Sequence, residues 1–284
     1  MADYTHNTAP TQFVEAGSIR FAYRRFGAKK GVPVVFFQHF MGNLDDYDPA
    51  VTDALAVDRE VILFNNAGVA SSSGTTPATI VDQAADAAAF LDALGLNNID
   101  FLAHSMGGMV AQEVAMSRPD LARRVVLVGT APRGGIGLGL REMGSATAAL
   151  FSATYEHQED MWLPILFAPS QSSQAAGRAF LKRIMVREDR DAPVSAASAE
   201  AQNVAVTSYG ASNDHTFAQL KNLKQPTLVV NGNNDIIVPT INSYYLQQHA
   251  PNATLILYPD ANHGPHNQYP EIFVRHTRVF LDED

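Results

Sequence analysis

The sequence predicts an α/β fold in which a mostly parallel central sheet carries helices on both faces. Short, continuous apolar runs indicate strands that are buried on both sides, as in parallel sheets. Segments with helical spacing of apolar residues alternate with these runs, which is the pattern of strand–helix–strand units. The apolar runs lie at 33–39, 60–66, 99–105, 123–131, 226–232 and 253–259.

The elements follow one another in a regular order. The first segment, 11–27, is interpreted as a β-hairpin with its turn at Ala16-Gly17. A helical pattern at 80–94 ends before Gly95, which acts as a stop signal. Further helices are expected after the third, fifth and sixth apolar runs, at 107–119, 240–250 and 270–281.

Residues 134–215 interrupt this alternation. They contain Ala-, Ser- and Met-rich helical patterns, broken by Pro164, Pro169 and Pro193, and no long β-branched run. Ordinary connections between a strand and a helix are much shorter than this. We therefore expect a helical cap at 134–215, inserted into a core formed by 1–133 and 216–284. Ordinary surface crossover helices are the alternative.

Composition limits the function classes. The chain of 284 residues is 46% hydrophobic and 17% charged, which suits one large domain with or without a lid. It has no cysteine, which excludes disulfides and thiolate catalysis. The net charge is 20 − 29 = −9, which argues against a nucleic-acid partner. Neither a secretory signal nor a membrane span is visible, so we expect a cytoplasmic protein that acts on a small molecule; its oligomeric state is not predicted.

The strongest chemical signal is the segment 102–108, Leu-Ala-His-Ser-Met-Gly-Gly, which follows an apolar strand and opens a helix. A serine at this turn, Ser105, stands at the carboxyl end of the sheet, where ligands bind in open α/β folds. The small residues Ala103 and Gly107 allow a sharp turn. The helix N-terminus favours a developing oxyanion beside the serine. A purely structural serine is the alternative.

A serine nucleophile needs a base and a group that orients the base. Asp235 follows the fifth apolar run and His263 follows the sixth, so both are expected at the same end of the sheet. His266 is a competing base, and Asp235 could instead cap a turn. Asp260 is too close in sequence to His263 to orient it easily. A metal between His263 and His266 is disfavoured, because no ligand set lies on a helix at the usual spacing.

An oxyanion hole needs two backbone donors. We expect one from the loop that follows the first buried strand, at the N–H of Phe40, and the other at the N–H of Met106. The Phe40 side chain could in addition plug the space between sheet and cap. His39 and His104 are interpreted as polar residues that form hydrogen bonds at strand ends.

At these residues the chain resembles the α/β-hydrolase superfamily, in the branch with a helical cap after the sixth strand. The resemblance runs from about Phe13 to the C-terminus and is strongest at 38–46, 103–108, 232–239 and 261–270. The order Ser, Asp, His along the chain is that of the superfamily. The resemblance implies that Ser105 is the nucleophile, Asp235 the acid and His263 the base.

Three departures from the family pattern stand out. Ala103 replaces the usual first glycine of the serine turn, as in some small bacterial lipases. Gln38-His39 replaces the common His-Gly before the oxyanion residue. Residues 65–68, Asn-Asn-Ala-Gly, replace Asp-x-Arg-Gly, so the loop 69–77 loses its habitual Asp and Arg anchors.

A serine at the turn excludes the members with an Asp nucleophile, namely haloalkane dehalogenases and epoxide hydrolases. We interpret the chain as a serine hydrolase of a carboxylic ester or lactone, near the esterase and cofactor-free haloperoxidase types, without metal or organic cofactor. Carbon–carbon hydrolases, perhydrolases and hydroxynitrile lyases use the same three residues, and a slow ligand sensor is a further alternative.

The acyl pocket is expected to be apolar. Side chains that could equally serve only to pack cap against core are the candidates for its lining. They are Phe40, Met41, Met106, Trp162, Phe167 and Met185.

Overall fold

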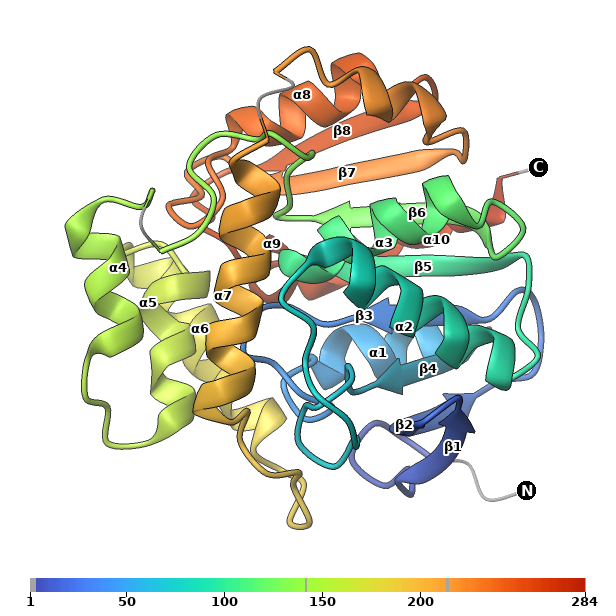
Figure 1. Cartoon of the computed structure of the whole chain (residues 1–284). Helices are drawn as coiled ribbons and strands as arrows, with labels where there is room; N and C mark the ends of the chain where they lie inside the picture. The colour runs from blue at the N-terminus through green and yellow to red at the C-terminus, as the bar shows by residue number, and fades with distance from the viewer. Residues whose placement is uncertain (1–3, 141, 213–214, 284) are drawn as a thin grey trace.

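A computed structural model describes residues 4–140, 142–212 and 215–283, and it contains an eight-stranded sheet (Figure 1). The strand order is β1-β2-β4-β3-β5-β6-β7-β8, with β2 antiparallel to β1 and β4 and the other pairs parallel. This confirms the predicted mostly parallel sheet. The strands are β1 (Gln12–Ala16), β2 (Ile19–Gly27), β3 (Val34–Phe37), β4 (Glu60–Phe64), β5 (Ile99–His104), β6 (Ala122–Val128), β7 (Thr227–Gly232) and β8 (Ala253–Tyr258).

Each face of the sheet has its own hydrophobic core, because successive strand residues point to opposite sides. On β3, Val35 and Phe37 belong to one core, and Val34 and Phe36 belong to the other. The first core is covered by α2 (Ile80–Ala93), α3 (Met106–Ser117) and α8 (Ile241–His249), and the second by α1 (Pro49–Ala56) and α10 (Pro270–Asp282). Burial on both faces explains why the central strands consist of continuous apolar runs.

Three short elements of the core were not predicted. Helix α1 has eight residues and begins after Asp48, whose side chain accepts a hydrogen bond from the N–H of Ala50. The others are α9 (Pro265–Gln268) and the 3₁₀ helix η2 (Ala218–Asn222). Periodicity is a weak signal over one or two helical turns, so such elements are hard to separate from loops.

Between β6 and β7 the chain contains the segment 134–215, here called the helical insertion, and the described residues of this segment form no strand. Figure 1 shows its helices stacked beside one end of the sheet. They are α4 (Ser145–Ser152), η1 (Gln158–Met161), α5 (Trp162–Leu166), α6 (Gln171–Ile184) and α7 (Ala196–Gly210). Within the described parts of the chain, no helix has the length and apolar character needed to cross a membrane.

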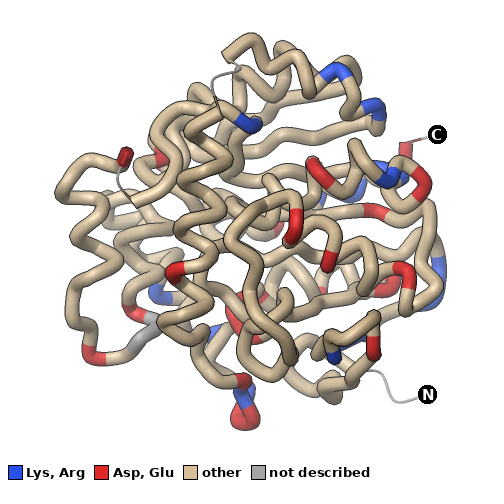
Figure 2. Tube along the Cα trace, in the orientation of Figure 1, with Lys and Arg blue, Asp and Glu red and all other residues tan. Residues whose placement is uncertain are grey.

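The loop after β4 is anchored by the helical insertion. Asn65 donates a hydrogen bond from Nδ2 to Asp191 Oδ2 over 2.6 Å, and Ser71 donates to the same oxygen over 2.7 Å. Asn65 Oδ1 accepts from the N–H of Leu44. Asp191 lies in the loop after α6, where Figure 2 shows basic and acidic segments side by side. A carboxylate from the insertion thus anchors a loop that lacks the Asp and Arg anchors usual in the family that the sequence resembles.

Candidate active site

Ser105 occupies a strained turn between β5 and α3. Its φ of 54° and ψ of −122° lie in a region that residues with a Cβ rarely adopt. A Cβ on Gly107 would come within 2.3 Å of the carbonyl oxygen of Phe37, and one on Gly108 within 2.6 Å of the Thr130 side chain. The two glycines therefore let α3 start directly against the end of β3 and the chain just after β6. The turn holds the serine at the carboxyl end of the sheet.

Three side chains from separate loops meet at this turn. Ser105 Oγ donates a hydrogen bond to His263 Nε2 over 2.8 Å, and His263 Nδ1 donates to Asp235 Oδ2 over 2.8 Å. The donors follow from the chemistry, because the carboxylate accepts at Nδ1 and leaves Nε2 as the acceptor for the hydroxyl. All three residues are buried. The structure therefore brings together Ser105, His263 and Asp235, as the sequence predicts.

Asp235 is held by its own loop. Its Oδ1 accepts hydrogen bonds from the N–H groups of Ile237 and Val238, at 2.8 and 3.0 Å. The loop lies close to the chain after β8, because a Cβ on Gly232 would come within 2.2 Å of the carbonyl oxygen of Asn262. Both carboxylate oxygens are thus engaged, one by the backbone and one by His263. Such an arrangement fixes the imidazole in one tautomer.

The competing acid and base lie elsewhere. The ring of His266 packs against those of His104 and Phe273, with centroids 4.5 and 5.7 Å apart, and burial lowers its pKa to about 3. Asp260 accepts hydrogen bonds from the hydroxyls of Ser170 and Ser172 in the insertion. Neither residue contacts Ser105 through a described hydrogen bond.

His39 and His104 both form hydrogen bonds at strand ends. His39 Nδ1 donates to the carbonyl of Phe40 over 2.9 Å, and His104 Nε2 donates to the carbonyl of His263 over 3.0 Å. Burial, with a smaller contribution from neighbouring histidines, lowers the pKa of His39 to about 4 and the pKa of His104 well below its usual range. These two rings are therefore neutral. His104 packs against the His263 ring and bonds to its carbonyl, and His39 packs against His104.

The predicted oxyanion donors lie beside Ser105. Met106 is the first residue of α3, so its N–H has no partner within the helix. Phe40 lies in the loop after β3, and its N–H makes no hydrogen bond to any described residue. The loop folds tightly, because a Cβ on Gly42 would come within 2.6 Å of the Gln38 side chain. Two unused donors thus remain available near the serine.

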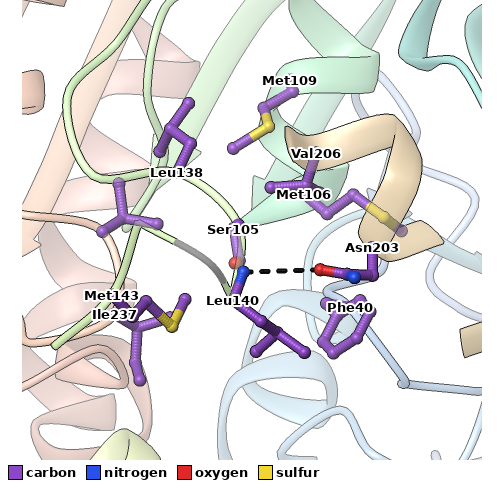
Figure 3. A pocket seen from close by; sticks show the side chains of 12 residues that line it. Phe40, Ser105, Met106, Met109, Leu138, Leu140, Met143, Asn203, Val206 and Ile237 are labelled. Atoms are coloured by element: carbon purple, nitrogen blue, oxygen red, sulfur yellow. Dashed lines mark hydrogen bonds between the residues drawn. The ribbon is translucent and has the colours of Figure 1, made fainter. Parts of the chain in front are cut away.

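A small cavity opens beside Ser105 (Figure 3). Its walls come from the sheet side and from the helical insertion, and they are apolar except for Ser105 itself and Asn203 of α7. Asn203 Oδ1 accepts a long hydrogen bond, 3.4 Å, from the N–H of Leu140. Lining residues are Phe40, Ser105, Met106, Met109, Leu138, Gly139, Leu140, Met143, Asn203, Val206, Ile237 and Val238.

Four predicted pocket residues lie away from this cavity, whereas Phe40 and Met106 line it. Trp162 packs against the His39 ring at 4.7 Å and lines a separate cavity together with Met41. Phe167 packs against Phe180 inside the insertion. Met185 ends α6 and is 46% exposed. Hydrophobic identity suggested these positions, but the packing of the helices directs the side chains elsewhere.

Comparison with known proteins places the chain in a family. The sequence model described as "Alpha/beta hydrolase family" matches residues 34–276. The chain belongs to the alpha/beta hydrolase family. It is an enzyme of that fold, and its resemblance to the superfamily is thereby confirmed.

Relatives of this alpha/beta hydrolase differ in their named activities. An alpha/beta hydrolase fold protein from Chitinophaga pinensis superimposes with a TM-score of 0.92 at 40% identity, over 99% of this chain and all of that one. The pimeloyl-[acyl-carrier protein] methyl ester esterase of Nitrosomonas europaea is 29% identical over 60% of this chain and 66% of its own length. The non-heme chloroperoxidase of Streptomyces lividans is 27% identical over 88% and 91%.

Most of the cavity lining of this alpha/beta hydrolase was not predicted from sequence. Ile237 and Val238 lie two and three residues after Asp235, so their place beside the site could have been inferred from the strand end. Leu138, Leu140 and Asn203 belong to the insertion and carry no local motif. Their position depends on how α7 and the chain before α4 pack over the sheet.

Proposed function

We propose that this alpha/beta hydrolase is a serine hydrolase that cleaves a carboxylic ester or lactone through an acyl-enzyme. The observation that carries the proposal is the pair of 2.8 Å hydrogen bonds that link Ser105 Oγ, the His263 ring and Asp235. A serine hydroxyl becomes nucleophilic when a neutral imidazole accepts its proton and a carboxylate stabilises the resulting imidazolium.

In the first half-reaction, Ser105 Oγ attacks the ester carbonyl carbon while His263 Nε2 takes the hydroxyl proton. The carbonyl oxygen becomes an oxyanion, which accepts hydrogen bonds from the N–H groups of Phe40 and Met106. The tetrahedral intermediate collapses when the C–O bond to the leaving group breaks, and His263 gives its proton to the departing alcohol. Ser105 then carries the acyl group as an ester.

In the second half-reaction, water attacks the acyl carbon and His263 accepts the water proton. Collapse of the second tetrahedral intermediate breaks the bond to Ser105 Oγ, which regains a proton from His263. The carboxylic acid leaves. The charges that the two half-reactions need are the Asp235 carboxylate, the transient imidazolium and the oxyanion of each tetrahedral intermediate.

The residues that line the cavity support an acyl group that is mostly apolar. Methionine and branched aliphatic side chains form most of its walls, and Asn203 adds one amide. The name of the esterase relative concerns a methyl ester, which is consistent with ester chemistry. We propose that residues 134–215 act as a cap that sets substrate choice, because they supply Leu138, Leu140, Met143, Asn203 and Val206 to the wall.

A fluorophosphonate probe followed by peptide mapping tests the nucleophile. We expect labelling at Ser105 in the wild type and no labelling in Ser105→Ala. Ser243→Ala is the control, because Ser243 is also buried but bonds to Asn231 in the core, and it should label like the wild type. Parallel assays with a p-nitrophenyl ester, a cyanohydrin and a vinylogous diketone test the reaction class. Faster turnover of the cyanohydrin or diketone than of every ester would contradict ester hydrolysis.

A further inference from the structure

The loop that carries the proposed oxyanion donor forms a hydrogen bond with the helical insertion through Met41, the loop residue with a left-handed backbone conformation. The N–H of Met41, which follows Phe40, donates a hydrogen bond over 2.9 Å to Oε1 of Gln202 on α7. The two residues are 161 positions apart. Gln202 has no exposed surface, so water does not compete for this bond.

Met41 has a backbone conformation that needs support. Its φ is +60°, in the left-handed region that residues with a Cβ adopt only at an energetic cost. Without a hydrogen-bond partner for its N–H, Met41 would lower its conformational energy by rotating out of this region. Gln202 supplies that partner. It therefore holds Met41, which follows Phe40, in this strained backbone conformation.

The hydrogen bonds around Phe40 leave one N–H free. The peptide that joins Phe40 to Met41 is held on both sides, because its carbonyl accepts from His39 Nδ1 and its N–H donates to Gln202. The N–H of His39 is held by Gln38 Oε1, at 2.8 Å. The carbonyl of His39 accepts from Gly42 at 3.2 Å. Within 39–42, the N–H of Phe40 is the one backbone N–H without a hydrogen bond to a described residue, and the bonds on either side of it set its direction.

The buried amide of Gln202 is poorly suited to a packing role. Its Nε2 makes no hydrogen bond to any described residue although it is buried. A buried polar group without a partner destabilises the fold, and an apolar side chain of the same size would avoid this. The amide oxygen, bonded to Met41, is therefore the feature that this side chain provides.

We propose that Gln202 is a positioning residue that keeps the oxyanion loop in its active conformation, so that the helical insertion takes part in the chemistry as well as in substrate choice. This rests on the proposed function, because it assumes that the N–H of Phe40 binds an oxyanion.

Two further hydrogen bonds join the chain after Phe40 to the helical insertion. Asn43 Nδ2 donates to the carbonyl of Ala192, and Asp45 Oδ2 accepts from the N–H of Asp191.

The test compares Gln202→Met with Ser198→Ala. Methionine keeps the length of the side chain but removes the acceptor. Ser198 lies one turn earlier on α7 and donates to the carbonyl of Gly68 over 2.8 Å, so its removal also cuts a tie between α7 and the core, away from the oxyanion loop. We expect Gln202→Met to lower kcat on a small ester by about 10- to 100-fold, with KM within about threefold. Ser198→Ala should stay within about threefold of wild type in both.

A second variant separates positioning from general damage. Glycine adopts the left-handed region without penalty, so Met41→Gly introduced into Gln202→Met should recover at least about threefold of the lost kcat. An equal loss in Gln202→Met and Ser198→Ala would overturn the proposal, since it would mean a loosened α7. So would a Gln202→Met variant with wild-type kcat.

Amide hydrogen exchange of the segment 38–43, read by mass spectrometry without substrate, tests the structural claim alone. Gln202→Met should exchange this segment faster than wild type, and Ser198→Ala should not. Unchanged exchange would overturn the role of Gln202 whatever the enzyme hydrolyses. If exchange rises but the wild type neither turns over esters nor labels at Ser105, the loop is held as proposed and the proposed function is what fails.

Discussion

The two sides of the cavity are held in different ways. On the sheet side, Asp235 accepts hydrogen bonds from two backbone N–H groups and from His263, and Ser105 sits in a turn that two glycines pack against neighbouring strands. On the insertion side, the hydrogen bond from Leu140 to Asn203 is 3.4 Å long, and no side chain of α4 is buried. Bonds of that length are weak.

This difference suggests a division of tasks. Groups that transfer protons need fixed distances, and short bonds to backbone provide them. Walls that accept an acyl chain tolerate small movements, so helix packing is sufficient for them. Changes on the sheet side should therefore affect every substrate, whereas changes on the insertion side should alter preference among substrates. The bond from Met41 to Gln202 is where we propose that the two sides meet.

The largest expected effect is that of Ser105→Ala. Loss of the nucleophile should lower kcat on all esters by roughly 10³-fold or more. The fold should persist, because the change removes one hydroxyl from a turn whose backbone is held by packing. Steady-state kinetics over an ester chain-length series, with thermal unfolding as the control, measures this. A loss restricted to some chain lengths would break the proposed division between the two sides.

The choice between the two histidines gives the next effect. His263→Ala should lose activity to a similar degree, because the base is removed. His266→Phe should stay within about tenfold of wild type, since it keeps the ring that packs against His104 and Phe273. The opposite ranking of the two variants would show that His266 is the base.

The sequence allowed the sheet side to be predicted because parallel strands bring their carboxyl ends to one edge. Ser105, Asp235 and His263 each follow a buried apolar run, so their meeting at that edge could be inferred without knowing any packing detail. Helix α1 was missed because eight residues are too few for a clear period.

The insertion side could not be predicted in this way. Gln202 and Asn203 are neighbours on α7, yet one bonds to Met41 and the other lines the cavity. Which residue faces which target depends on the rotation of α7 about its axis, and that is fixed by long-range packing of residues such as Ala205 and Tyr209 into the core. Met185 and Trp162 have the composition of pocket residues, but composition does not determine direction.

A stability effect of about 2 kcal/mol is expected from His266, one of the buried histidines on the sheet side. The folded pKa of His266 is about 3, lowered by burial and then by His39 and His263, against an ordinary value of 6.5. Between these values the unfolded chain binds a proton that the folded chain does not. The stabilisation is therefore complete above about pH 6.5 and is lost as the pH falls towards 3, by about 1.4 kcal/mol per unit.

His266→Phe isolates this contribution. Between pH 7.5 and 5, the free energy of unfolding of the wild type should fall by about 2 kcal/mol more than that of the variant. Urea unfolding at both pH values measures the difference. An identical fall in both proteins would mean that His266 is protonated in the folded state or exposed to water, and that this side of the site is less rigid than the short bonds indicate.

The smallest effect is expected on the insertion side, where two methionines form a matched pair. Met143 lines the cavity, whereas Met185 was a pocket candidate by sequence but is exposed at the end of α6. Met143→Ala should enlarge the cavity and shift relative kcat/KM towards longer acyl chains, by roughly 1–2 kcal/mol between the shortest and longest esters. Met185→Ala should leave the ranking of esters as it is.

The measurement is kcat/KM over the same ester series, with fluorophosphonate labelling of Ser105 as the control. Labelling should persist in both variants, because neither methionine forms a hydrogen bond with Ser105, His263 or Asp235 among the described contacts. A shift in preference with Met185→Ala and none with Met143→Ala would mean that the acyl chain runs towards α6, and the assignment of the cavity walls would then be wrong. Equal losses on every ester with Met143→Ala would instead remove the distinction between the two sides, since an insertion residue would then control the chemistry without selecting the substrate.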